Sequence, residues 1–371
     1  MKKRLLFILM ISCSIAFSGY AQALNTGPGV NKKAWIGEQI GITKIFIDYT
    51  RPGVKGREGK IWGTGIAHYG YQYLGFGPSQ EAPWRAGADM NTIITFSEDV
   101  IVEGKPLAAG TYGLFMGLGE SETTVIFSNN ASAWGSFFYD SSEDALRVTV
   151  KNQTLDTSVE WLKYEFINQT ANSTTVALSW EKRMIPFKVE SDLVKTHIAS
   201  FKRQLQTDVG FVYQSFMQAA QFCLANNTEL EQALEWAEAA VSAPFVGVEN
   251  FSTLSLKASV LTALNRQAES DEVMKTALPY GSMNQLHQYA RSLLARGKSE
   301  EAFEVFKINY DKRPTELTTM IGLGRGYSAL GQYKKALKYM KQALPQIPAG
   351  PNKASVEAMI EKLKAGKDAN K

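Results

Sequence analysis

Hydrophobic and polar residues alternate with a period of two through the first half of the chain. Between residues 41 and 187 the alternation recurs in short runs that are rich in β-branched and aromatic residues and bounded by turn-formers. The clearest runs are residues 92–96, 123–127, 146–150 and 174–180. About seven or eight strands at this spacing predict an antiparallel β-sandwich over residues 38–188.

One short motif within this region predicts a local contact. Residues 107–112 end in Tyr112 and have the form of a tyrosine corner. In such a corner the phenol hydroxyl bonds back to nearby backbone and fixes the arch between two sheets. We therefore expect a structural role for Tyr112.

From residue 192 onward the hydrophobic period becomes helical. A linking helix is expected over residues 191–210, because its apolar residues fall on one face. Beyond it, four residues recur at a spacing of 34, with Gly297, Ala302, Phe306 and Pro314 reappearing as Gly331, Ala336, Met340 and Pro348. This period is typical of tetratricopeptide helix pairs.

The repeat pattern extends over residues 211–366. Two clear repeats span residues 283–314 and 317–348, and two degenerate ones precede them, around residues 233–240 and 263–277. An amphipathic stretch at residues 355–363 would cap the open end of the stack. The predicted fold is thus a two-domain chain, an antiparallel β-sandwich followed by a tetratricopeptide-like α-solenoid.

The first residues have the pattern of a secretory signal peptide. Three basic residues precede an apolar run at residues 5–17 and a small-residue segment, which predicts a signal peptide over residues 1–21. The alternative, lipid anchoring at Cys13, is disfavoured because apolar residues continue beyond that cysteine. No other segment reaches membrane-spanning length. We expect an exported protein, periplasmic or secreted.

Net charge and cysteine content limit the kinds of partner and the disulfide bonds that we expect. The net charge is +4, and three of the positive charges belong to the predicted signal peptide, so the remaining chain is nearly neutral. Near neutrality argues against nucleic acid as a partner. Cys223 is the second of two cysteines, and after removal of the signal peptide it has no partner for a disulfide. Its apolar neighbours on a helix predict a buried, inert thiol.

The irregular segment between residues 51 and 91 is the first candidate site. A long irregular stretch within a compact domain is usually functional or disordered, and the tryptophans here favour order. Guanidinium groups hold carboxylates or phosphates and aromatic rings stack on flat ligands. The candidate ligand-binding residues are Arg51, Lys55, Arg57, Trp62, His68, Trp84 and Arg85. The alternative is that Arg51, Arg57 and Arg85 pair with acidic residues such as Asp48, Asp89 and Asp99.

The sequence contains no catalytic signature, and we predict no cofactor. His68, His197 and His287 occur in three separate segments without metal-binding spacing, so no metal site is expected. An enzyme acting on a small molecule or glycan would need an acid or base such as His68, Glu81 or Asp89 beside a bound group.

The repeats supply the second candidate site. Counting from the 34-residue register, His287 and Arg291 occupy the concave face in one repeat, and Ile321 and Arg325 occupy it in the next. Arg291 and Arg325 would form a column that takes an acidic or C-terminal peptide segment. The alternative is a solvated face without a ligand.

Several motifs in the β-region resemble one bacterial family. They are the Tyr-Thr-Arg-Pro segment that begins at residue 49 and continues to Arg57, Ile61-Trp-Gly, Trp84-Arg85, Phe96-Ser, the 104–115 segment, Trp134-Gly135 and Trp180-Glu181. Together they resemble the domain of unknown function 2911 family over residues 38–188. The resemblance implies an exported bacterial protein, in some members with similar helical repeats, but no activity. This chain departs from the family pattern by an insertion at residues 71–83.

These observations predict an exported envelope protein that acts as a binding or scaffold module. Its helical repeats would contact a protein or peptide partner. The alternative is an enzyme, or a protein that binds a small ligand or glycan, through the loop at residues 51–91.

Overall fold

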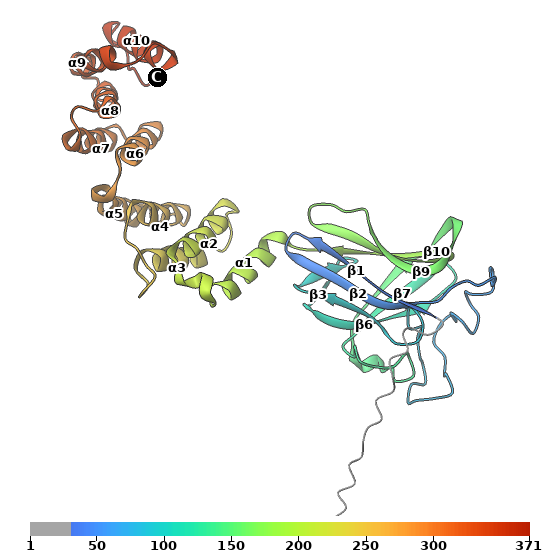
Figure 1. The fold of residues 1–371 in the computed structure, drawn as a ribbon. Helices are drawn as coiled ribbons and strands as arrows, with labels where there is room; N and C mark the ends of the chain where they lie inside the picture. The colour runs from blue at the N-terminus through green and yellow to red at the C-terminus, as the bar shows by residue number, and fades with distance from the viewer. Residues whose placement is uncertain (1–30) are drawn as a thin grey trace, which may run out of the picture. The chain divides into compact units, whose positions relative to one another are not determined.

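The computed structural model describes residues 31–371 and divides them into two compact units, one ending at Thr196 and the other beginning at His197. The predicted signal peptide and Cys13 lie outside the described residues. The first unit is rich in strands and the second is helical (Figure 1).

The strand-rich unit contains two antiparallel sheets. The first has the order β1 (Lys32–Ile40), β2 (Thr43–Arg51), β3 (Thr92–Phe96), β6 (Gly110–Leu118), β7 (Glu122–Ser128) and β8 (Asp144–Lys151). The second has the order β5 (Lys105–Leu107), β4 (Val100–Val102), β10 (Ser173–Glu190) and β9 (Gln153–Ile167). The runs predicted at residues 92–96, 123–127, 146–150 and 174–180 lie within β3, β7, β8 and β10.

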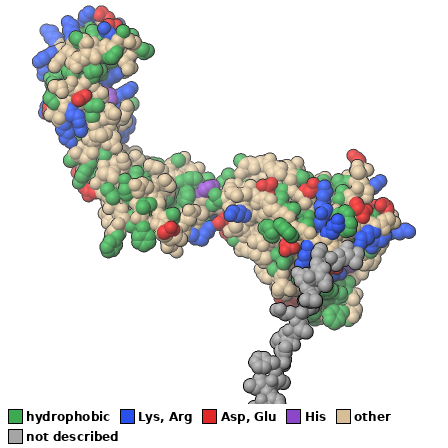
Figure 2. Space-filling model, in the orientation of Figure 1, with side chains coloured by type: hydrophobic (Ala, Val, Ile, Leu, Met, Phe, Trp, Pro, Cys, Tyr) green, Lys and Arg blue, Asp and Glu red, His purple; other side chains and the backbone are tan. Residues whose placement is uncertain are grey.

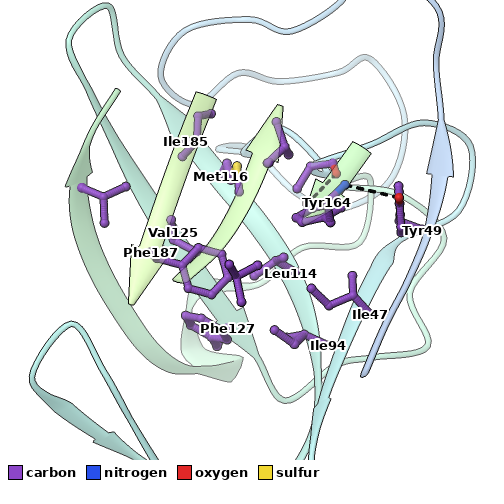
Figure 3. Packing of buried hydrophobic residues seen from close by; sticks show 14 of the residues in the cluster. Ile47, Tyr49, Ile94, Leu114, Met116, Val125, Phe127, Tyr164, Ile185 and Phe187 are labelled. Carbon is purple, nitrogen blue, oxygen red and sulfur yellow. Dashed lines mark hydrogen bonds between the residues drawn. The ribbon is translucent and has the colours of Figure 1, made fainter. Parts of the chain in front are cut away.

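Both sheets contribute to one hydrophobic core. In β2 the residues Ile45, Ile47 and Tyr49 are buried, while the residues Lys44, Phe46 and Asp48 that alternate with them are exposed, as the period of two requires. Figure 3 shows Tyr49 of the first sheet beside Tyr164 of the second, where the backbone N–H of Tyr164 donates to the Tyr49 hydroxyl at 3.3 Å. Each fully buried aliphatic side chain stabilises the unit by roughly 1.5–3 kcal/mol.

The predicted tyrosine corner is confirmed. The hydroxyl of Tyr112 donates a hydrogen bond to the backbone carbonyl of Ala108 at 2.9 Å, within the turn between β5 and β6. Its ring is buried near Phe96 and Phe127. The corner therefore ties the turn to the core.

The irregular segment between β2 and β3 is an ordered loop. Isolated bridges connect Trp62 to Ala67, Tyr69 to Leu118, Gln72 to Ala82 and Trp84 to Met116. Several of its apolar side chains join the core, including Val54, Ile61 and Ala67, which are fully buried. This packing explains why a segment without regular strands adopts one ordered conformation.

Ten α-helices follow within the described residues. The linking helix predicted over residues 191–210 is α1 (Leu193–Gln204), and the division between the two units falls inside it. The others are α2 (Tyr213–Ala225), α3 (Leu230–Ser242), α4 (Phe251–Ala263), α5 (Gln267–Ala277), α6 (Met283–Ala295), α7 (Ser299–Lys312), α8 (Leu317–Ala329), α9 (Tyr333–Ala343) and α10 (Pro351–Lys364).

The sequence repeat corresponds to two helix pairs. Helices α6 and α8 start 34 residues apart, as do α7 and α9. Small residues allow the helices to approach closely: a Cβ at Gly322 in α8 would lie 2.7 Å from the ring of Phe306 in α7. Helix α10 buries Val356 and Ile360 in a cluster with Met340 of α9. It therefore covers the last pair, as the amphipathic pattern at residues 355–363 predicts.

Candidate functional sites

The arginines predicted to bind a ligand in the β2–β3 loop donate to the chain's own backbone. The Nε of Arg51 donates to the carbonyl of Leu162 at 2.7 Å. Arg57 donates to the carbonyls of Val54 at 2.9 Å and Gly53 at 2.7 Å. These bonds hold the loop against β9 and close its first turn, so a ligand at either guanidinium group would have to replace them.

Arg85 and Lys55 are also engaged within the unit. Arg85 donates to the backbone carbonyl of Asp89 at 3.1 Å and lies over the ring of Phe137 at 5.8 Å, and its burial lowers the pKa of the guanidinium group. The Nζ of Lys55 lies 5.7 Å from the ring of Trp161. Within residues 31–371, no carboxylate forms an ion pair with Arg51, Arg57 or Arg85; their partners are backbone carbonyls.

The three candidate acid or base residues do not converge. His68 is buried, and its burial lowers the pKa of the imidazole, while its Nδ1 atom lacks a hydrogen-bond partner. The carboxylate of Asp89 accepts from the side chain of Asn31 at 3.1 Å. Glu81 lines a separate cleft. The geometry thus gives no shared site for them.

The insertion at residues 71–83 forms one wall of that cleft. Its volume is about 630 Å³, and Phe138, Tyr139 and Arg147 also line it. Gly77 has a φ of +77°, and a Cβ there would lie 2.2 Å from the carbonyl oxygen of Phe137, so only glycine permits this approach. The insertion is therefore packed against the loop after β7.

A different cleft lies beside Trp62. Its volume is about 360 Å³, and it is lined by Trp62, Glu120, Ser121, Asn152, Gln153, Thr154, Glu181, Lys182 and Arg183. The guanidinium group of Arg183 lies 4.7 Å from the centre of the Trp62 ring. Trp84 and Trp180 pack edge-on against Trp62 at 5.7 Å and 5.8 Å. Trp84 is thus a buried support for the cleft and does not line it.

Glu181 of this cleft has an unusual backbone. It has a φ of +50°, in the left-handed region, and it lies where the pairing of β9 with β10 shifts register. Its side chain is buried and accepts a hydrogen bond from the backbone N–H of Gly59 at 3.2 Å. Strained residues and bulges concentrate at functional sites. The sequence pointed to Glu181 only as part of the Trp180-Glu181 motif, and it did not single out Arg183.

The four residues predicted on the concave face of the repeats differ in exposure. Arg291 is exposed, and no hydrogen bond or ion pair from the described residues holds its side chain. Burial lowers the pKa of Arg325, and the charge of Arg291 lowers it further, so the two guanidinium groups lie close enough to interact. His287 packs against Phe306 and Ile321 joins the cluster beneath α10. Arg325 donates to the side chain of Asn370 at 3.2 Å.

A larger groove lies between α4 and α6. It has a volume of about 860 Å³, and its walls are mainly small and amide-bearing side chains, among them Ser255, Ser259, Thr262, Gln285, Gln288 and Ser292, with Phe251 and Tyr289. The hydroxyl of Ser255 is buried without a hydrogen-bond partner. Sequence reasoning missed this groove, although Ser255 and Ser259 are spaced four apart on one face of α4.

Metal and thiol chemistry have little support in the described part of the chain. Residues 31–371 contain no group of three or more His, Cys, Asp or Glu side chains placed to hold a metal ion. Cys223 is fully buried, and its burial raises the pKa of the thiol. No helix among these residues is both long and apolar enough to span a membrane.

Comparison with known families finds one match, and it lies in the strand-rich unit. Residues 31–189 match the family described as protein of unknown function (DUF2911), so the resemblance in the motifs is confirmed and extends slightly further than residues 38–188. No curated protein matches the chain.

Solved structures similar to the chain include tetratricopeptide proteins. The crystal structure of MamA is 14% identical, with a TM-score of 0.31, and the match covers 41% of this chain and 88% of that one. YrrB, described as a TPR protein with an unusual peptide-binding site, is 18% identical, with a TM-score of 0.30 and coverage of 42% and 79%. A thermophilic TPR protein of Thermus thermophilus is 16% identical, with a TM-score of 0.29 and coverage of 47% and 91%.

Proposed function

We propose that this protein is an exported envelope scaffold, a β-sandwich followed by a tetratricopeptide-like α-solenoid. The solenoid binds a segment of a protein partner between helices α4 and α6. The groove between α4 and α6 is the single observation that carries the proposal. It belongs to the helical unit alone. An extended peptide would fill it with side chains and hydrogen-bond through its backbone to the side chains of Asn284 and Gln288, which line the groove.

The lining of the groove suits an extended chain. Ser259 and Thr262 are small, so the backbone of a partner can approach α4 closely, and amide side chains on α6 both donate and accept. Arg291 lies on α6, the helix that forms one wall, and carries an unpaired charge. A partner with an acidic residue beyond the groove would gain a charge-assisted hydrogen bond there.

Obstruction of the groove tests this function. Ser259 is exposed on α4, so Ser259→Arg would place a long side chain across the groove with little effect on folding. Thr276→Arg on α5 is the matched control, because Thr276 is exposed and does not line the groove. The intact chain would be used for capture from an envelope fraction. A specific partner should be retained by the wild type and Thr276→Arg and lost with Ser259→Arg; equal capture by all three contradicts the proposal.

A second candidate function, the binding of a small hydroxylated ligand such as a glycan, is favoured by Glu181. A buried carboxylate held in a left-handed conformation at a bulge is costly to keep, and it lies in a cleft with an indole and a guanidinium group. Carboxylates bind sugar hydroxyls, and aromatic rings stack on sugar faces. Glu120 lines the same cleft and supplies a second carboxylate that can accept from a hydroxyl group.

This candidate is tested by calorimetry with soluble oligosaccharides. Wild-type chain should show saturable binding, and Glu181→Gln should reduce the affinity because the amide changes the charge but not the size. Trp134→Phe is a control, since Trp134 is exposed and lies outside the cleft. Absence of binding to every oligosaccharide, or equal affinity of wild type and Glu181→Gln, would remove the glycan as the ligand.

Export is part of the proposal and rests on the pattern at residues 1–21. Expression in a Gram-negative host followed by fractionation and N-terminal sequencing should find the mature chain outside the cytoplasm, starting after Ala21 or Ala23. A full-length cytoplasmic chain contradicts export. A mature chain that begins with a lipidated Cys13 would replace secretion by anchoring.

A further inference from the structure

The last residues of the chain fold back onto helix α8. Residues 366–371, here called the return segment, follow α10 and lie against the side of α8 that carries Arg325 and Ser328. Ala369 of the segment is buried in the hydrophobic cluster beneath α10. The return segment therefore packs into the hydrophobic cluster of the last helices as well as bonding to α8.

Arg325 and Asn370 are joined by two hydrogen bonds. The guanidinium group of Arg325 donates to the Asn370 side-chain oxygen at 3.2 Å, and the Asn370 amide donates to the backbone carbonyl of Arg325 at 3.0 Å. The two bonds run in opposite directions between the same residues. Such a reciprocal pair recognises a carboxamide and discriminates against side chains that only donate or only accept.

Ser328 recognises the segment one turn further along α8. Its hydroxyl donates to the carboxylate of Asp368 at 2.7 Å and accepts from the backbone N–H of Ala369 at 2.8 Å. Burial raises the pKa of the Asp368 carboxyl, but hydrogen bonds from Ser328 and Asn370 outweigh it and leave the pKa below its ordinary value. The carboxylate thus lies near Arg325 as an anion.

We propose that the return segment occupies a peptide-binding position on α8 and that the partner's own segment, with an acidic residue and a carboxamide two positions later, replaces it. This inference rests on the proposed function of the repeats. The recognition chemistry is that of the segment already in place, Asp368-Ala369-Asn370. Figure 2 shows Lys and Arg side chains gathered over α7 to α10, which suits an acidic partner.

Tethering makes the return segment a strong competitor. A short flexible connection gives a bound segment an effective concentration in the millimolar range. A free peptide with micromolar intrinsic affinity would therefore bind the intact chain weakly until the segment is displaced. A partner binds at α8 only if its affinity is high enough to displace the return segment. A partner that also fills the groove between α4 and α6 gains the additional affinity that this displacement requires.

The experiment uses a labelled peptide with the sequence of residues 365–371 and the full chain. The double variant Asp368→Ala/Asn370→Ala removes the side-chain contacts of the return segment and should bind the peptide about ten-fold more tightly than the wild type, the change that loss of about 1.4 kcal/mol of competition produces. Lys367→Ala is the matched control, because Lys367 is an exposed residue of the same segment, and it should behave as the wild type. Adding Arg325→Ala to the double variant should abolish the gain.

Peptides with alanine in place of the Asp or the Asn should bind the double variant more weakly than the parent peptide. Equal binding of the parent peptide to wild type and double variant overturns the proposal, as does a gain that survives Arg325→Ala. A second measurement avoids dependence on variants that fold poorly. In the wild type, millimolar unlabelled peptide should accelerate hydrogen exchange at the amide of Ala369, and a scrambled peptide should not; unchanged exchange also overturns it.

These assays contain no protein partner, so their failure is separable from failure of the proposed function. Capture of a partner through the groove, combined with no peptide binding at Arg325, would retain the scaffold and remove the role of the return segment.

Discussion

His287 in α6 lies close enough to Arg325 in α8 for the positive charge of the guanidinium group to disfavour protonation of the imidazole. Burial is the largest cause, and the positive charges of Arg325 and Arg291 add to it, so that the pKa of His287 falls from 6.5 to about 4. A Cβ on Gly322 of α8 would lie 3.1 Å from the Nδ1 atom of His287, which shows how closely the two helices pack. The imidazole is therefore neutral at pH 7.

This pKa predicts acid sensitivity of the helical unit. Because the folded pKa lies below the unfolded value of 6.5, the unfolded chain binds more protons between pH 6.5 and about 4. The contribution that neutral His287 makes to the free energy of unfolding is fully present above pH 6.5, and it is lost as the pH falls toward about 4. The shift corresponds to roughly 3 kcal/mol at most, and partial exposure reduces this to about 1–2 kcal/mol.

An NMR titration of the His287 imidazole and urea unfolding at pH 7.5 and 4.5 check this prediction. In His287→Gln, the loss of free energy of unfolding at the lower pH should be smaller than in the wild type by about 1–2 kcal/mol. Thr276→Ala serves as the control, since Thr276 is an exposed residue of the same unit that does not titrate, and it should keep the pH dependence of the wild type. An imidazole that titrates near pH 6.5 would contradict the prediction.

Tyr112→Phe should destabilise the strand-rich unit by about 0.5–1.5 kcal/mol, the net value of one hydrogen bond. The variant keeps the buried ring and leaves the carbonyl of Ala108 without its donor. Thermal unfolding followed by circular dichroism measures the change. Tyr73→Phe, at an exposed residue, should have almost no effect. Similar melting of wild type and Tyr112→Phe would show that the corner adds no stability.

The strands were predictable where one face is buried and the other is not. In β2 the buried residues Ile45 and Ile47 alternate with Lys44, Phe46 and Asp48, which are exposed, so the period of two corresponds directly to burial. In β10 the predicted run stops at Trp180, whereas the strand continues to Glu190. The register shift around Glu181 interrupts the alternation there, because a bulge moves later side chains to the opposite face.

The candidate sites were less predictable, for a different physical reason. Arg51 and Arg57 donate to backbone carbonyls, and every residue carries such an acceptor, so the sequence contains no signal for these partners. The contact of Arg325 with Asn370 joins residues that are 45 apart in sequence. By contrast, the 34-residue period predicts equivalent places for Arg291 in α6 and Arg325 in α8, because both helices start at the same point of the repeat.

Cys223 should resist thiol reagents in the native protein. The side chain is fully buried in α2, and burial raises the pKa of the thiol, so little thiolate forms and reagents cannot reach it. A Cys13→Ser chain isolates this thiol. A maleimide should label it slowly without denaturant, at least about 100-fold more slowly than in concentrated urea. Rapid labelling of the folded chain would show that α2 opens readily or that the thiol is accessible.

The strained backbone at Glu181 predicts that a glycine variant is more stable than an alanine variant, the reverse of the usual order in a strand. Both Glu181→Gly and Glu181→Ala remove the carboxylate that accepts from Gly59, so their difference reports the backbone alone. A left-handed conformation costs a non-glycine residue roughly 1–2 kcal/mol. The glycine variant should therefore be the more stable of the two by about 1 kcal/mol in urea unfolding.

Glu165 in β9 supplies the matched pair, since it lies in regularly paired strand opposite Ala177. There the usual preference holds, and Glu165→Gly should be less stable than Glu165→Ala by about 0.5–1 kcal/mol because glycine loses more conformational freedom on folding. Opposite signs at the two positions would establish that the chain maintains strain at Glu181. The same sign at both would mean that the bulge holds this residue without strain, and it would remove the observation that favours a ligand in the cleft.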